Sequence, residues 1–260
     1  MVDVDARLES LVRRERAVTL AALAVLVALA WIHFVRLGRG MTAMAAMGMA
    51  VDPWTARDAA LAAAMWATMM VAMMLPSASP MILMFTGLNR RRRERGEPRH
   101  VDTPLFVLGY LVIWTEFSIA AATAQWGLQR AALLGDDAMA ATPIVAASLL
   151  ILAAIYQVTP LKYACLARCR TPLGFLMTEW REGPAGAFVM GLRHGLFCLG
   201  CCWALMTLLF VGGVMNLTWV AALTVFVLIE KLIPAGRLVS RTSAMLLLIW
   251  AAWIVLHATR

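Results

Sequence analysis

Long apolar stretches alternate with short charged segments along the whole chain. Seven of these stretches approach the roughly 20 apolar residues that a helix needs to cross a bilayer. The pattern therefore predicts an all-α fold, a polytopic bundle of about seven transmembrane helices that forms a single domain over residues 1–260. The predicted membrane spans cover residues 17–36, 59–84, 104–126, 143–160, 187–211, 217–234 and 241–257.

The composition supports a membrane protein and argues against a nucleic-acid-binding one. Hydrophobic residues make up 62% of the chain and charged residues 15%, whereas ordinary soluble domains are about half apolar and a quarter charged. The net charge of +8 would suit nucleic acid, but the basic residues lie between the apolar stretches, where they set membrane topology. We therefore expect the protein to interact with the lipid bilayer and not with nucleic acid.

Arginine and lysine are concentrated in alternate connecting segments. They cluster at the N-terminus and after the second, fourth and sixth predicted spans. The positive-inside rule then predicts a cytoplasmic N-terminus and an outer C-terminus for a multi-pass protein of the bacterial inner membrane. No cleavable signal peptide is evident, so the first span is expected to stay as an anchor.

A short interfacial helix is predicted after the fourth span. Thr159 and Pro160 suit the N-cap and the first helical position, and Pro172 limits the helix at its other end. Cys165 and Cys169 would lie one turn apart on this helix, at the cytoplasmic surface.

The most distinctive stretch runs from residue 194 to residue 206. On a helix, His194, Cys198 and Cys202 share one face at i, i+4 and i+8, and Cys201 lies beside Cys198. Thiols and imidazole are ligands that suit Cu(I) or zinc. Thiols facing the cytoplasm stay reduced, so metal ligation or redox chemistry is favoured over structural disulfides. The alternative is packing, because free cysteine is often buried as a small hydrophobic residue.

Methionine is concentrated in one part of the chain, since 11 of its 18 copies lie between Met41 and Met84. The second predicted span carries a ladder of thioethers, whose members are Met65, Met69, Met70, Met73 and Met74. The ladder continues an outer segment that contains Met41, Met44, Met47 and Met49. Such a ladder could bind Cu(I), or its methionines could fill gaps between helices.

Three further groups of polar or small residues lie in the predicted spans. Glu116, near the middle of the third span, is a possible intramembrane polar site and is expected to face the bundle interior. Glu230 and Lys231 close the sixth span, where we expect them to pair or to extend toward the interface. Gly191 and Gly195 would permit a close helix crossing.

Four stretches with these residues resemble a known family. They are 65–77 with Pro80, 156–172, 195–206 and 230–236. In them the chain resembles a bacterial family described as predicted metal-binding integral membrane proteins. The resemblance implies an integral membrane protein in which these methionines and cysteines bind a metal.

The main hypothesis is a membrane protein that binds a soft transition metal and takes part in its transport, delivery or homeostasis. Copper(I) is preferred over zinc or another soft metal, because a path of thioethers suits Cu(I) and holds zinc poorly. A metallochaperone or another membrane subunit would be its protein partner. The alternatives are a membrane thiol-redox or metal-dependent oxidoreductase component, and a structural or assembly subunit of a membrane complex. No GxxxxGK[ST] motif is present, so the chain does not carry that ATP-binding loop.

Overall fold

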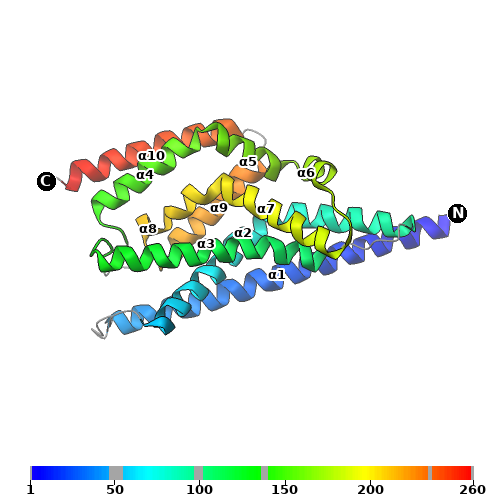
Figure 1. The fold of residues 1–260 in the computed structure, drawn as a ribbon, viewed down its shortest axis with the longest axis horizontal. Coiled ribbons are helices and arrows are strands. Elements are labelled where there is room, and N and C mark those ends of the chain that lie inside the picture. Colours follow the sequence, from blue (N-terminus) through cyan, green and yellow to red (C-terminus); the bar gives the residue numbers. More distant parts are fainter. Residues whose placement is uncertain (1, 47–54, 97–101, 136–139, 234–235, 259–260) are drawn as a thin grey trace.

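A computed structural model describes residues 2–46, 55–96, 102–135, 140–233 and 236–258. These residues are helical apart from turns, short connections and an isolated bridge between Leu134 and Ala141. The prediction of an all-α fold is therefore confirmed (Figure 1). The helices are α1 (Val2–Ala46), α2 (Ala56–Glu94), α3 (Thr103–Arg130), α4 (Pro143–Gln157), α5 (Pro160–Arg170), α6 (Pro172–Glu179), α7 (Gly183–Thr207), α8 (Leu209–Gly212), α9 (Leu217–Leu232) and α10 (Gly236–Ala258).

The structure supports a multi-pass membrane protein but does not confirm the predicted count of seven spans. Among the described residues, five helical segments are long and apolar enough to cross a bilayer. The pair α4 and α5, bent by 68°, would add a sixth if it forms one broken span. Helix α9 has only 16 residues, which is short for a spanning helix. The orientation of the chain in the membrane stays a prediction.

Helix α1 extends well beyond the apolar stretch that predicted it. It includes the charged N-terminal segment and also Met41 and Met44 of the outer methionine segment. Hydropathy marks only the part of a helix that suits the bilayer, so polar extensions of the same helix are invisible to it. Met47 and Met49 lie outside the described residues.

The helices pack as neighbouring pairs around a central group (Figure 1). Helix α1 lies along one edge and packs on α2, while α4 and α10 pair at the opposite edge. Helix α3 packs against both α2 and α7 in the middle of the molecule. The central helices α2, α3 and α7 therefore supply much of the buried core.

The crossing of α3 and α7 depends on glycines. A Cβ atom on Gly191 would lie 2.0 Å from the carbonyl oxygen of Phe106, and one on Gly109 would lie 2.2 Å from that of Phe188. A Cβ atom on Gly195 would lie 2.9 Å from the side chain of Ile113. The prediction that Gly191 and Gly195 permit close helix approach is confirmed.

Local signals set the limits of α5 as predicted. Thr159 is its N-cap, and the Thr159 side chain accepts a hydrogen bond of 3.3 Å from the backbone N–H of Lys162. The helix ends at Arg170, before Pro172. Pro172 then starts α6, a further short helix that the sequence pattern did not predict.

Helix α2 continues through two internal prolines. Because Pro80 has no N–H, the carbonyl of Pro76 loses its helical partner. The hydroxyl of Ser79 donates a 2.7 Å hydrogen bond to that carbonyl in its place. The polar group is thus satisfied inside an apolar bundle without a break in the helix.

Candidate metal site

One face of α7 is buried along its whole cysteine-bearing stretch. His194, Cys198, Cys201, Cys202 and Met206 are each 2% exposed or less. Helical spacing places these side chains on one side of α7, and that side faces the bundle interior. The predicted helix face is therefore confirmed.

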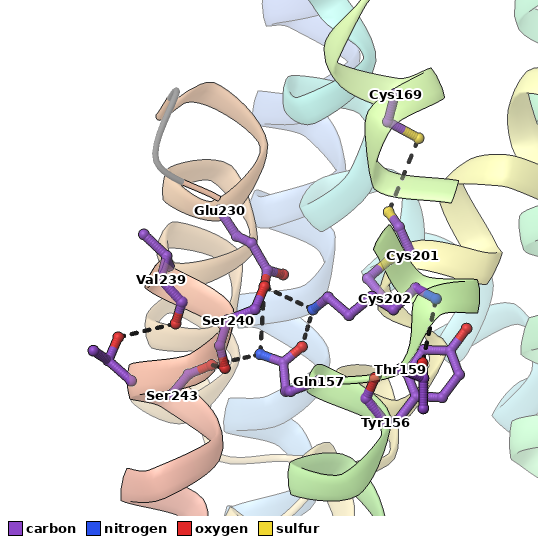
Figure 2. A network of polar contacts seen from close by, with 12 residues as sticks. Tyr156, Gln157, Thr159, Cys169, Cys201, Cys202, Glu230, Val239, Ser240 and Ser243 are labelled. Carbon is purple, nitrogen blue, oxygen red and sulfur yellow. Dashed lines mark hydrogen bonds and ion pairs between the residues drawn. The ribbon is translucent and has the colours of Figure 1, made fainter. Parts of the chain in front are cut away.

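Sulfur atoms from three helices meet at this face. The sulfur atoms of Cys201 on α7 and Cys169 on α5 are 3.9 Å apart (Figure 2). The sulfur atoms of Cys202 on α7 and Met74 on α2 are also 3.9 Å apart. The thiols of Cys201 and Cys202 each donate a 3.0 Å hydrogen bond to the backbone carbonyl of Cys198, one turn earlier on the same helix. These five residues, Cys169, Cys198, Cys201, Cys202 and Met74, are called the sulfur cluster below.

Cys198 has polar partners besides the thiols. The ammonium of Lys231 on α9 donates to its sulfur at 3.0 Å and to the hydroxyl of Ser77 at 2.9 Å. The hydroxyl of Tyr110 on α3 lies 3.1 Å from the same sulfur and donates to the carbonyl of Met74 at 3.1 Å. Cys198 is thus the point where the sulfur cluster meets a fixed positive charge.

A buried ion pair lies beside the cluster. The ammonium of Lys162 on α5 is 2.6 Å from the carboxylate of Glu230 on α9, and these side chains are 0% and 2% exposed. The carboxylate also accepts a 2.8 Å hydrogen bond from the hydroxyl of Ser240 on α10 (Figure 2). Gln157 on α4 donates to the hydroxyl of Ser243 at 2.6 Å and accepts from Lys162 (Figure 2). This network joins α4, α5, α9 and α10, and α5 also carries Cys169.

The expected role of Glu230 and Lys231 at the membrane interface is wrong. Both residues are buried, at 1% and 7% exposure for the whole residue. They also contact different partners, because Glu230 pairs with Lys162 and Lys231 contacts Cys198. Neighbouring positions on a helix point about 100° apart, which sends the two charges to separate partners.

His194 lies in a box of aromatic rings. It stacks on Phe106 and Tyr110 and meets Phe175 edge-on, with ring centroids 5.5 to 6.0 Å apart. Its Nδ1 atom is buried and has no hydrogen-bond partner among the described residues. His194 precedes Cys198 by one helical turn, and this nitrogen is available to bind a metal ion.

The other predicted site residues lie outside the cluster. Met65, Met69, Met70 and Met73 are buried in the core of α2, and Met74 is the member of the ladder whose contact with a thiol is described. Cys165 is half-buried and packs on Gly200. A Cβ atom added to Gly200 would lie 2.7 Å from the sulfur of Cys165. Glu116 is exposed on α3, so the expectation that it faces the bundle interior is wrong.

Comparison with known proteins gives one family. Residues 63–254 match PpoB2, a family described as copper chaperone. The chain belongs to this copper chaperone family. The matched segment contains the sulfur cluster, Lys231 and the buried network around Glu230. No curated protein and no solved structure matches the chain.

The two sulfur pairs of the cluster are spaced much as two ligands of one metal ion are. Two sulfur ligands about 2.3 Å from a tetrahedral zinc ion, for example, lie about 3.8 Å from each other. The two 3.9 Å pairs fall near this value. Among the described residues, however, no group of three or more His, Cys, Asp or Glu side chains already has the arrangement to hold a metal ion. Binding an ion through three or more of these side chains would require them to move closer together.

Tyr110, Ser77 and Lys162 lie at or beside the sulfur cluster of this copper chaperone family member but were not predicted. Tyr110 and Ser77 look like ordinary residues of apolar helices, and no periodic pattern marks them. Lys162 gave a usable signal, since a lysine three residues from a cysteine on a short helix is close enough to share its environment.

Proposed function

We propose that the chain is a membrane-embedded copper(I) chaperone that holds its cargo in the sulfur cluster. The observation that carries this proposal is the convergence of four cysteines and one methionine from α2, α5 and α7, of which all but the half-buried Cys169 are buried. Soft thiolate and thioether ligands select Cu(I) among the common metals. Membership of the copper chaperone family supports copper handling.

The thiols are proposed as the strong ligands of the cargo. Cys198, Cys201 and Cys202 lie on one rigid helix, and Cys169 reaches them from α5. Cu(I) replaces the protons of the thiols that bind it, so loading releases protons. The unpartnered Nδ1 of His194 would supply a further donor one turn away.

The methionine ladder of α2 is proposed as the path by which copper reaches the thiols. Met65, Met69, Met70 and Met73 form a buried column that leads to Met74. Thioethers carry no charge and exchange Cu(I) readily, whereas thiolates bind it more strongly. Copper would therefore pass down the ladder and stop at the sulfur cluster. The direction across the membrane depends on a cytoplasmic N-terminus, and reporter fusions to each end of the chain test that orientation.

Metal analysis of the purified full chain tests the proposed site. The protein is loaded with Cu(I) under a reductant, passed over a desalting column and analysed for copper. We expect bound copper in the wild type and its loss when Cys169, Cys198, Cys201 and Cys202 are changed to serine. Cys165→Ser is the matched control, because its thiol packs on Gly200. Equal and negligible copper in wild type and variants would refute the proposal.

The methionines have their own test. Met74→Leu should weaken Cu(I) retention, because it removes the thioether that contacts Cys202. Met84→Leu is its control on the same helix, since Met84 is exposed. Leucine keeps most of the volume, so the two variants differ mainly in the sulfur that is lost. Equal copper retention in the two variants would exclude Met74 as a ligand.

A redox function is the second candidate. The Cys169–Cys201 distance of 3.9 Å favours it, because a modest approach of α5 to α7 would allow a disulfide. Two-electron oxidation of these thiols needs an electron acceptor such as a quinone, and it releases two protons. Alkylation followed by mass measurement distinguishes the two functions. A reversible Cys169–Cys201 disulfide in protein that binds no copper would favour the redox function.

A further inference from the structure

Lys231 is a buried cation without a carboxylate partner among the described residues. The residue is 7% exposed, and the nearby Glu230 carboxylate is paired with Lys162. Burying one charge without an opposite one is costly in a bilayer. The ammonium instead contacts the sulfur of Cys198 and the hydroxyl of Ser77. The group that can offset its charge is therefore the sulfur cluster itself.

The charge of a loaded cluster depends on the ion that it holds. A monovalent ion with two thiolates carries a net charge of −1, and a divalent ion with two thiolates carries none. With the ammonium of Lys231 beside Cys198, the first arrangement becomes neutral and the second carries +1. A neutral arrangement is the more stable one in a low-dielectric interior.

We infer that Lys231 is the counter-charge of the loaded site and makes the chaperone selective for a monovalent ion held by two thiolates. This inference rests on the proposed function, since it assumes that the sulfur cluster binds the cargo. Lys231 acts through its fixed charge and binds no metal itself. Its partner Ser77, on α2, holds the ammonium in place over Cys198.

The test compares two ions that both bind two thiolates but differ in charge. Silver(I) stands in for Cu(I), and mercury(II) is the divalent counterpart. The affinity of each for the full chain in detergent is measured by competition with glutathione. The variants are Lys231→Met and Lys231→Gln, which remove the charge, Lys231→Arg, which keeps it, and Ser77→Ala, which removes a hydrogen bond but no charge.

We expect the neutral variants to bind silver(I) at least about thirtyfold more weakly, the lower end of the effect of losing one partner of a buried charge pair. Their affinity for mercury(II) should stay the same or rise. Lys231→Arg and Ser77→Ala should keep the silver-to-mercury ratio within about threefold of wild type, since both keep the charge. A purely structural role would weaken both ions together, so opposite responses identify the charge.

Three results would overturn the inference. They are an equal loss of both ions in the neutral variants, unchanged silver(I) binding in those variants, and an arginine variant that behaves like the methionine variant. If wild type itself binds neither copper nor silver, the proposed function fails instead. Thermal unfolding of each variant, monitored by the reactivity of its buried thiols, identifies any variant that fails to fold. If Lys231→Met fails to fold, Lys231→Gln takes its place, and the reverse.

Discussion

The glycine crossing of α3 and α7 gives the sharpest test of the fold around the sulfur cluster. A Cβ atom on Gly191 would lie 2.0 Å from the carbonyl oxygen of Phe106, whereas ordinary contact begins at 3.4 Å. Gly191→Ala therefore forces α3 and α7 apart by 1.4 Å, the difference between these two distances. The obstacle is backbone, so no side-chain rotation relieves it.

The cost of this separation follows from packing. A gap of 0.5 to 1 Å already forfeits roughly a quarter to a half of a van der Waals contact, and overpacking a core costs about 1 to 3 kcal/mol. We expect Gly191→Ala to reduce the free energy of unfolding by about 3 kcal/mol, at the upper end of that range. The contact between Tyr110 and Cys198, 3.1 Å in the wild type, should lengthen as well.

Thermal unfolding in detergent measures the effect through a maleimide dye that fluoresces on reaction with thiols. The buried cysteines of α7 react only when the bundle opens. Gly127→Ala, on α3, the other helix of the crossing, is the control because nothing lies within 4 Å of its added Cβ atom. The control should be neutral or slightly stabilising, as expected for glycine replaced by alanine in a helix. If Gly191→Ala is as stable as Gly127→Ala, the tight crossing is wrong.

Three further predictions concern the buried charges, the thiols and the cargo. Lys162→Met alone should reduce the free energy of unfolding by about 3 to 5 kcal/mol, because it leaves Glu230 without its cation. Adding Glu230→Gln should recover a large part of this loss. A double variant whose loss equals the sum of the two single losses would contradict the pairing. Mild oxidation of copper-free protein should join Cys169 to Cys201, seen by mass after alkylation, and prior copper loading should protect them; a disulfide that forms equally in loaded protein would exclude these thiols as ligands. Cu(I) at about one hundred times its dissociation constant should raise the free energy of unfolding by about 2.7 kcal/mol, and the melting temperature should rise with it. A Cu(I) chelator should reverse this rise. An unchanged melting temperature would show that the folded chain does not bind the ion.

Sequence patterns predicted the parts of the site that depend on a single helix. The thiol face of α7 follows from the spacing of Cys198 and Cys202, and the start of α5 follows from Thr159 and Pro160. Helical periodicity and capping act within a few residues, so one stretch of sequence carries the whole signal.

The parts that depend on neighbouring helices were harder to predict. The sequence around Lys231 does not specify whether the side chain extends to the membrane interface or contacts Cys198. The position of α7, which carries Cys198, decides between the two. Glu116 was expected inside because carboxylates are costly in lipid, but the interior side of α3 is occupied by residues such as Tyr110 and Trp114. The count of seven spans is not confirmed, because α9 has only 16 residues, and its hydropathy alone does not distinguish it from part of a longer helix.

The Lys162–Glu230 network also orders the events of synthesis. Lys162 and Gln157 leave the ribosome well before Glu230, and Ser240 and Ser243 follow near the C-terminal end of the chain. A lysine side chain that reaches the bilayer interior before its carboxylate partner has no stable place there. We therefore expect helix α5, with Cys169, to settle against α7 only once α9 and α10 have entered the membrane. Under the proposed function, a nascent chain would lack the full set of thiols for copper until its translation is nearly complete.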